Sequence, residues 1–158
     1  MKSVRLLDKP PAFMSFSKAT GARRRGVLYE WKVLEKLAEA VIGKPELTLI
    51  KHPWFEFWDE NGRHWCQPDA LLLGLEQNLI YEVKYKHCAE AWFQLWRLYV
   101  PVLEKWAGSA GKKWQGIEVV KWHDPATNFP EKYSLAADIL EIPRNGRTAV
   151  HIWNPARD

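Results

Sequence analysis

Hydrophobic positions recur at helical spacing between Gly26 and Ile42. The residues that share this spacing are Val27, Leu34, Leu37 and Val41. Gly43 and Pro45 follow directly, and both residue types are typical of the end of a helix. The pattern therefore predicts a helix over residues 26–42 with one apolar face directed at a core.

Short runs rich in apolar and aromatic residues follow this helix and predict strands. They cover residues 47–51, 54–58, 65–73 and 79–85. The stretch 59–62 reads as a turn between two of them. Residues 88–106 predict a second helix, in which Pro101 can introduce a kink, and residues 116–122 predict a further strand.

The last part of the chain gives a weaker pattern. Ser134 can cap a short helix that extends to Leu140, and residues 148–153 predict a final strand. The order α-β-β-β-α-β predicts an α/β fold with a mixed central sheet flanked by helices. We expect one domain over residues 21–158, preceded by an irregular N-terminal arm over residues 1–20.

Composition and charge fit this picture. The chain has 158 residues, the size of one ordinary domain, and a net charge of +4, which is weak support for an anionic partner. The two cysteines, Cys66 and Cys88, give no disulfide framework, and no stretch resembles a signal peptide or a membrane span. We therefore expect a cytoplasmic protein, with no membrane partner, from a bacterial, archaeal or phage-infected cell.

Two acids and one lysine lie on neighbouring predicted strands. Glu82 and Lys84 point to the same face because side chains alternate along a strand. A short connection pairs the strands antiparallel, which brings Asp69 close to Glu82, and Glu30 lies on the apolar face of the first helix. An ion pair at a strand edge is the alternative for each residue alone, and for Glu30 a half-buried side chain near Arg23–Arg25.

Three carboxylates and one ammonium suit Mg²⁺, with Mn²⁺ as a substitute, because hard cations prefer oxygen ligands and keep several waters. Such an ion lowers the pKa of a bound water and neutralises a phosphodiester oxygen. A lysine beside it can orient or help activate the water and stabilise developing charge. The residues therefore predict hydrolysis of a phosphodiester bond.

The pair Pro68-Asp69, twelve further residues and then Glu82-Val83-Lys84 resembles the signature of the PD-(D/E)xK nuclease superfamily. The segment Arg24-Arg25-Gly26 through Tyr29-Glu30 also resembles the start of archaeal Holliday junction resolvases. The resemblance extends over residues 23–122 and implies a restriction-endonuclease-like core. It further implies metal binding by Asp69, Glu82 and the backbone carbonyl of Val83, a catalytic Lys84, and a Glu30 that completes the site directly or through water.

RecB-type and lambda-exonuclease-like members carry a glutamine and a tyrosine three intervening residues apart on the helix after the lysine. Gln94 and Tyr99 have four residues between them here, which places them on different faces of a regular helix. Gln94 shares a face with Arg97, and this pair either contacts DNA or forms a polar face exposed to solvent.

We therefore expect a Mg²⁺-dependent deoxyribonuclease, either an exonuclease or a structure-specific endonuclease in DNA recombination, repair or phage DNA processing. The residues expected to contact the DNA backbone are Arg23, Arg24, Arg25, Lys86, Gln94 and Arg97. One alternative is a Holliday junction resolvase, which requires a dimer because it makes two cuts. An alternative of another class is an inactive DNA-binding or assembly subunit. RNA as substrate, a homo-oligomer, and a helicase or annealing-protein partner are all compatible with the sequence.

Other sites are disfavoured by their spacing. His64, Cys66, His87 and Cys88 form adjacent or near-adjacent pairs that fit one tetrahedral zinc ion poorly. No glycine-rich loop followed by Lys-Ser/Thr is present, so ATP hydrolysis is not expected.

Overall fold

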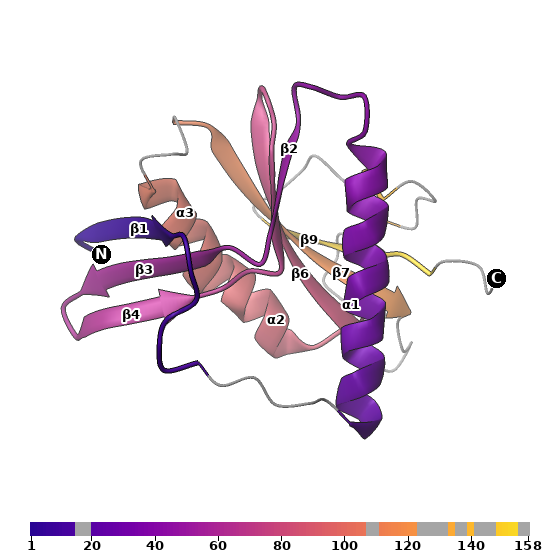
Figure 1. Cartoon of the computed structure of the whole chain (residues 1–158), viewed down its shortest axis with the longest axis horizontal. Helices are drawn as coiled ribbons and strands as arrows, with labels where there is room; N and C mark the ends of the chain where they lie inside the picture. The colour runs from indigo at the N-terminus through magenta and orange to yellow at the C-terminus, as the bar shows by residue number, and fades with distance from the viewer. Residues whose placement is uncertain (15–19, 107–110, 123–132, 135–138, 141–147, 155–158) are drawn as a thin grey trace.

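The computed structural model describes residues 1–14, 20–106, 111–122, 133–134, 139–140 and 148–154 (Figure 1). The fold is α/β, with a mixed central sheet and helices packed against both of its faces. This agrees with the architecture that the sequence predicts. No described helix has the length and apolarity needed to cross a membrane.

The central sheet contains antiparallel and parallel neighbours. Its strands, in spatial order, are β2 (Thr48–Lys51), β5 (Ala70–Leu73), β6 (Gln77–Lys86), β7 (Lys113–Trp122), β9 (Thr148–Ile152) and β8 (Tyr133–Ser134). The pairs β2–β5 and β5–β6 are antiparallel, while β6–β7, β7–β9 and β8–β9 are parallel. Because β5 begins only at Ala70, the last residues of β6 extend beyond it, and this end of the sheet is open on one side.

Helix α1 (Gly21–Ala40) covers one face of the sheet. It buries Tyr29, Val33, Leu34 and Leu37 against alternate residues of β5, β6 and β7. The helix begins earlier than the predicted residue 26, so the arginines at positions 23–25 lie inside its first turns rather than before it. Gly43, with a φ of 75°, follows the helix and supplies the left-handed conformation of the turn.

The opposite face of the sheet is covered by one helical segment in three parts. These are α2 (Ala89–Gln94), the π-helical turn η1 (Leu95–Tyr99) and α3 (Val100–Lys105). Buried residues of η1 and α3 pack on Leu71 and Ile80 of the sheet. The predicted helix over residues 88–106 is therefore present, and Pro101 lies at the start of α3, where a missing N–H is tolerated.

A second, antiparallel sheet extends from the central one, with the order β1–β3–β4 (Figure 1). Its strands are β1 (Ser3–Leu7), β3 (Trp54–Asp59) and β4 (Gly62–Cys66). The prediction of an irregular arm is thus wrong for Ser3–Leu7, because β1 pairs with β3 along its whole length.

The predicted strand over residues 65–73 is also wrong as a single element. Strand β4 ends at Cys66 in the small sheet, and β5 begins at Ala70 in the central sheet. Pro68 lies between them and lacks the N–H that a continuous ladder requires, so the chain changes sheets there.

The C-terminal part is described at β8, at residues 139–140 and from β9 to residue 154. The predicted final strand over residues 148–153 corresponds to β9. The predicted helix that Ser134 would cap lies mostly at residues 135–138, outside the described part; Ser134 itself belongs to β8, and residues 139–140, at the predicted end, form a turn rather than a helix.

Candidate metal centre at the open end of β6

Asp69 is held against β6 by backbone and side-chain hydrogen bonds. Ala70 pairs with Tyr81 at the end of the β5–β6 ladder, so Asp69 comes level with Glu82 one residue further on. The N–H of Asp69 donates to the Tyr81 carbonyl (3.1 Å), and the N–H of Val83 donates to Oδ2 of Asp69 (2.6 Å). The first predicted acid is therefore fixed beside the strand that carries the second acid and the lysine.

The same hydrogen bond orients the backbone of Val83. Within a strand, the N–H and the C=O of one residue point to the same edge. Because the Val83 N–H points toward Asp69, its carbonyl also faces the open edge of β6. This orientation is compatible with the metal-binding role predicted for that carbonyl.

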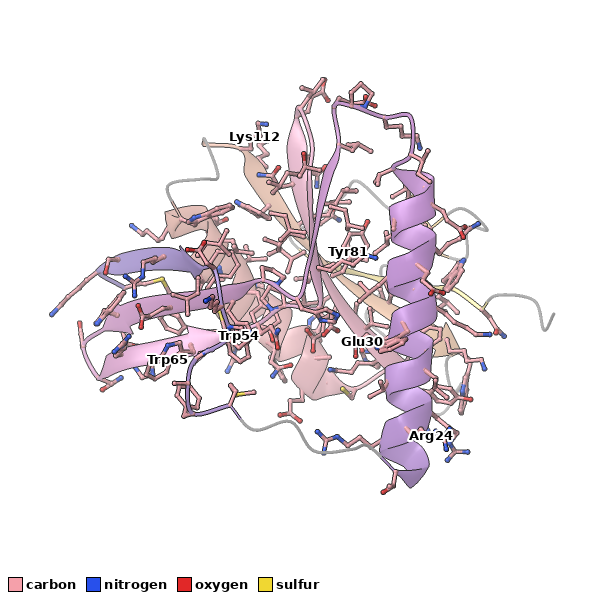
Figure 2. The ribbon with its side chains drawn as sticks, in the orientation of Figure 1. Arg24, Glu30, Trp54, Trp65, Tyr81 and Lys112 are labelled. Atoms are coloured by element: carbon pink, nitrogen blue, oxygen red, sulfur yellow. The ribbon has the colours of Figure 1, made fainter. Side chains whose placement is uncertain are left out.

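Glu30 reaches the site from α1, on which it faces the strands (Figure 2). Its side chain is half-buried. Burial, and next the charge of Asp69, raise the pKa of Glu30 to about 7, while Lys84 acts in the opposite direction. These surroundings favour the neutral, protonated form of Glu30 unless a cation binds beside it.

Glu82 and Lys84 form a close pair. The Nζ atom of Lys84 lies 2.6 Å from Oε1 of Glu82. Burial lowers the pKa of Lys84, but the charge and hydrogen bond of Glu82 outweigh burial, so the pKa lies above its usual value. Lys84 therefore keeps its proton in this structure.

Glu82 is almost fully buried, and its second oxygen is unsatisfied. Burial and the charge of Asp69 raise the pKa of Glu82 to about 7, against the opposing effect of Lys84. Its Oε2 atom has no hydrogen-bond partner among the described residues. A buried carboxylate oxygen without a donor is costly, and a cation or a bound water would remove that cost.

Asp69 shows the same tendency. Burial raises its pKa, and the Val83 N–H, Lys84 and His52 reduce this rise without cancelling it. Three carboxylates thus share one end of the sheet, and each has a raised pKa. The excess of acidic groups over the ammonium of Lys84 is the main electrostatic property of the site.

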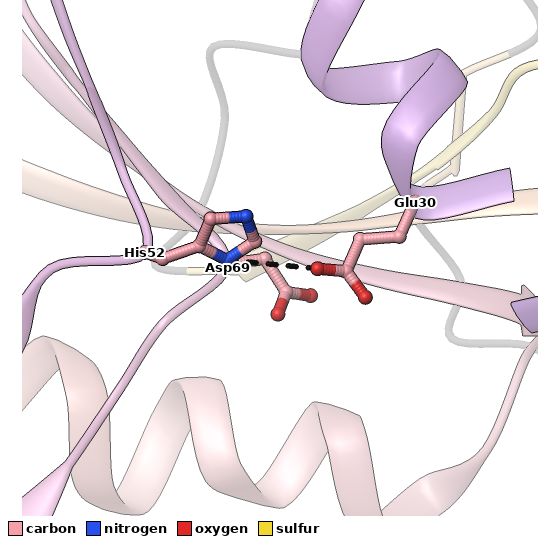
Figure 3. A group of neighbouring side chains, drawn as sticks. All are labelled: Glu30, His52 and Asp69. Carbon is pink, nitrogen blue, oxygen red and sulfur yellow. Dashed lines mark ion pairs between the residues drawn. The ribbon is translucent and has the colours of Figure 1, made fainter. Parts of the chain in front are cut away.

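His52 belongs to this site, although no pattern in the sequence points to it. It follows β2 directly, and one ligand atom each from His52, Glu30 and Asp69 lie within 4.8 Å of one another (Figure 3). Glu82 is not a member of this group of three, and its Oε1 is turned to Lys84 instead. A single histidine before a proline carries no periodic pattern, so only the fold reveals this neighbour.

Tyr99 is also at the site, although its spacing from Gln94 leaves its role open, and Gln94 itself is partly exposed. Hydrogen bonds in the π-helical turn η1 span one residue more than in an α-helix, and Tyr99, at the end of this turn, is buried. The Tyr99 hydroxyl donates to the Gln67 carbonyl (3.2 Å). Burial, and next the charges of Glu82 and Asp69, raise the pKa of Tyr99, which places this hydroxyl beside both acids.

Glu118 is a further buried acid that sequence reasoning missed. It is the register partner of Glu82 on the neighbouring strand β7. Its carboxylate lies 2.7 Å from Nδ1 of His87 and accepts a hydrogen bond from the N–H of Cys88 (3.1 Å). Glu118 lies between Ile117 and Val119 in the sequence, and the reasoning applied to Glu82 could have identified it.

The residues expected to contact DNA are exposed or partly exposed. Arg23, Arg24 and Arg25 are exposed on α1, and Figure 2 shows Arg24 near the first turn, below Glu30. The ammonium of Lys86 lies 5.3 Å from the ring centroid of Trp122. Their role stays a prediction.

Arg97 is part of an exposed aromatic group. Its guanidinium lies 4.7 Å from the ring centroid of Phe93 and 5.4 Å from that of Trp96. Gln94, on the same helical segment, is partly exposed. Aromatic and basic side chains together suit contacts with bases and phosphates, but they also occur as ordinary surface contacts.

No protein-family model matches the sequence, and a search of curated proteins finds no match. Among solved structures, the crystal structure of protein VC1899 from Vibrio cholerae is similar to part of the chain, with 14% identity and a TM-score of 0.46. The similarity covers 64% of this chain and 27% of that chain. The chain therefore spans about a quarter of the length of VC1899, and a similarity at this level identifies neither a family nor an activity.

Proposed function

We propose that this protein is a divalent-metal-dependent DNA nuclease with a restriction-endonuclease-like core. The observation that carries the proposal is the convergence of Glu30, Asp69 and Glu82, all with raised pKa values, around the ammonium of Lys84. A divalent cation would balance this excess of negative groups, and Oε2 of Glu82, which has no described hydrogen-bond partner at bonding distance, would be one of its ligands.

The order of elements supports the proposed core. When β1 and the β3–β4 hairpin are set aside, the chain runs α1, β2, β5, β6, the segment α2–α3 and then β7. We take this order as support for the restriction-endonuclease-like core that the resemblance implies. Asp69 and Glu82 lie at the open end of neighbouring strands within it.

In the proposed reaction, Glu30, Asp69, Glu82 and the Val83 carbonyl would hold Mg²⁺ or Mn²⁺. The bound ion would supply Lewis-acid stabilisation of a phosphate oxygen and a water of lowered pKa. Lys84 keeps its proton next to Glu82, so it would stabilise charge on the phosphate and orient the attacking water rather than accept a proton. Tyr99, through the Gln67 carbonyl, would keep the segment before Asp69 in place.

The substrate is proposed to be DNA, held through its backbone by the basic residues around the site. Contacts of this kind position a nucleic acid without reading its sequence. Exonuclease or structure-specific endonuclease action in recombination, repair or phage DNA processing fits such a surface. A junction resolvase and an inactive DNA-binding subunit are the alternatives that the experiment must separate.

The test is cleavage of end-labelled linear, nicked, single-stranded and four-way junction DNA with Mg²⁺ or Mn²⁺, with EDTA, and with the Lys84→Ala variant. Lys36→Ala is the matched control, because Lys36 is an exposed lysine of α1 whose ammonium pairs with Glu39. Cleavage by wild type and by Lys36→Ala, abolished by EDTA and in Lys84→Ala, supports the proposal. DNA that is shifted but uncut under every condition would identify a binding subunit instead.

A further inference from the structure

His52 has an unusual backbone conformation at the point where the chain leaves β2. Its φ is 49°, and it is the one non-glycine residue with a positive φ in the described part of the chain. Positive φ is uncommon outside glycine, although asparagine, aspartate and histidine adopt it more often than other residues.

Two hydrogen bonds hold the His52 backbone, and both come from the segment of Asp69. The N–H of His52 donates to the Asp69 carbonyl (2.9 Å), and Nε2 of Gln67 donates to the His52 carbonyl (3.1 Å). The backbone of His52 is therefore fixed to the same segment that carries the first acid.

The imidazole of His52 is directed at Glu30 and Asp69 (Figure 3). Its Nδ1 atom lies 3.6 Å from Oε1 of Glu30, and an oxygen of Asp69 completes a group within 4.8 Å. Metal bonds of about 2.1 Å place octahedral ligands about 3 to 4 Å apart, so a small closure of the three side chains accommodates an ion.

A simple ion pair between His52 and Glu30 accounts for their 3.6 Å contact, but it does not account for the Asp69 oxygen that belongs to the same group of ligand atoms. Independently, Oε2 of Glu82 is buried without a hydrogen-bond partner at bonding distance among the residues that the structure describes. Together the imidazole and the unpaired oxygen indicate an incomplete coordination sphere.

We propose that His52 is a nitrogen ligand of the metal held by Glu30 and Asp69, and that it shifts the preference of the site from Mg²⁺ to Mn²⁺. This inference rests on the proposed function, because it concerns the same ion. Mg²⁺ takes oxygen ligands almost exclusively, whereas imidazole nitrogen favours first-row transition metals. Mn²⁺ accepts both nitrogen and carboxylate ligands.

The test is pulsed electron paramagnetic resonance of the Mn²⁺-loaded protein, which detects ¹⁴N nuclei bonded to the ion and does not depend on cleavage. Wild-type protein is expected to show a histidine nitrogen coupling that changes when histidine is labelled with ¹⁵N. His52→Asn is expected to lose it, because asparagine tolerates the same backbone conformation but offers no imidazole. His64→Asn is the matched control, since His64 contacts Asp59 on the small sheet, and it should keep the coupling.

Calorimetric titration gives a second readout. His52→Asn is expected to bind Mn²⁺ about tenfold or more weakly, the loss typical of a perturbed metal site. Its Mg²⁺ affinity should change much less. If His52→Asn fails to fold, His52→Gly keeps the positive φ and replaces it in both measurements.

Three results would overturn the inference. They are a Mn²⁺-loaded wild type without nitrogen coupling, a coupling that persists in His52→Asn, and equal losses of Mg²⁺ and Mn²⁺ affinity. In each case metal-dependent DNA cleavage can still occur, so the proposed function is judged separately by the Lys84→Ala assay. Absence of any metal binding, together with absence of cleavage, would overturn both.

Discussion

The N–H of Val83 donates to Oδ2 of Asp69 at 2.6 Å, one residue before β5 begins at Ala70. This hydrogen bond fixes an acid from a connecting segment to the strand that carries Glu82 and Lys84. It leaves Oδ1 of Asp69 available for other partners. The backbone of β6 thus fixes the position of Asp69 through Oδ2, and the other carboxylate oxygen can bind a ligand.

Asp69→Asn should separate activity from stability. The amide cannot replace a charged metal ligand, so we expect cleavage to fall by about 100-fold or more. The substitution also removes a buried charge whose pKa is raised, so the metal-free variant should unfold at the same temperature as wild type or a higher one. Thermal unfolding in EDTA and a cleavage time course check both, and a large loss of stability would contradict the assignment.

The pH dependence of stability should show the raised pKa values of Glu30 and Glu82. The pKa values of Glu30 and Glu82 are raised from about 4.5 to about 7, so the folded state holds their protons more tightly than the unfolded state. The free energy of unfolding of the metal-free protein should therefore fall as pH rises from about 4.5 to about 7. Mn²⁺ should restore it at about pH 7.5 and have little effect at about pH 5, where the acids are protonated.

Glu82→Gln is the control for this pH effect. It removes one of the acids with a raised pKa, so the fall in stability across this pH range should be smaller in EDTA. Thermal unfolding at several pH values from about 5 to about 7.5, with and without Mn²⁺, gives the comparison. An unchanged pH profile in Glu82→Gln would show that another group is responsible.

Tyr99→Phe should affect catalysis more than folding. Loss of one hydroxyl that donates to the Gln67 carbonyl costs about 1 kcal/mol of stability. We expect a cleavage rate reduced by about tenfold at saturating metal, since about 1.4 kcal/mol of lost positioning corresponds to a factor of ten. Tyr85→Phe is the matched control, because it removes the hydroxyl of a partly buried tyrosine that lies on β6 rather than on η1. Equal rates in the two variants would show that Tyr99 only fills space.

Glu118→Ala should destabilise the fold. The change leaves the buried His87 and the N–H of Cys88 without their shared acceptor, and breaking a buried pair costs about 3 kcal/mol. Glu118→Gln retains a hydrogen-bond acceptor and should cost less. Denaturant unfolding of both variants measures the difference. If Glu118→Ala is as stable as wild type, the pair does not anchor the junction between β6 and α2.

Arg24→Gln and Arg25→Gln should weaken DNA binding without sequence preference. Removal of one arginine–phosphate interaction should reduce the slope of log affinity against log salt concentration by about 0.9. Fluorescence anisotropy of labelled duplexes in EDTA, at several salt concentrations, gives this slope. Lys44→Gln, an exposed lysine beyond the other end of α1, is the matched control and should leave the slope unchanged.

Local patterns could predict the acids and the lysine because strand alternation and an amphipathic helix fix their directions. Glu30 lies on the inner side of α1, and Asp69 lies level with Glu82, as the pattern requires. The sheet is mixed and has helices on both faces, as predicted. Periodicity was sufficient to predict which residues of each helix and strand face the core, because that depends on neighbours close in sequence.

The features that could not be predicted depend on contacts between distant segments. Strand β1 forms only by pairing with β3, far along the chain. His52 reaches the site because its backbone is bonded to Asp69. The π-helical turn that redirects Tyr99 leaves no mark in the hydrophobic pattern, since the same residues would also form a regular α-helix.

Both connections between the two sheets run through the site. His52-Pro53 leads from β2 out to the hairpin, and Gln67-Pro68 leads back to Asp69. Hydrogen bonds join those two connections to each other at His52. A longer or different tip at residues 59–62 would leave these hydrogen bonds in place, and so would leave His52 and Asp69 where the chemistry is proposed to occur.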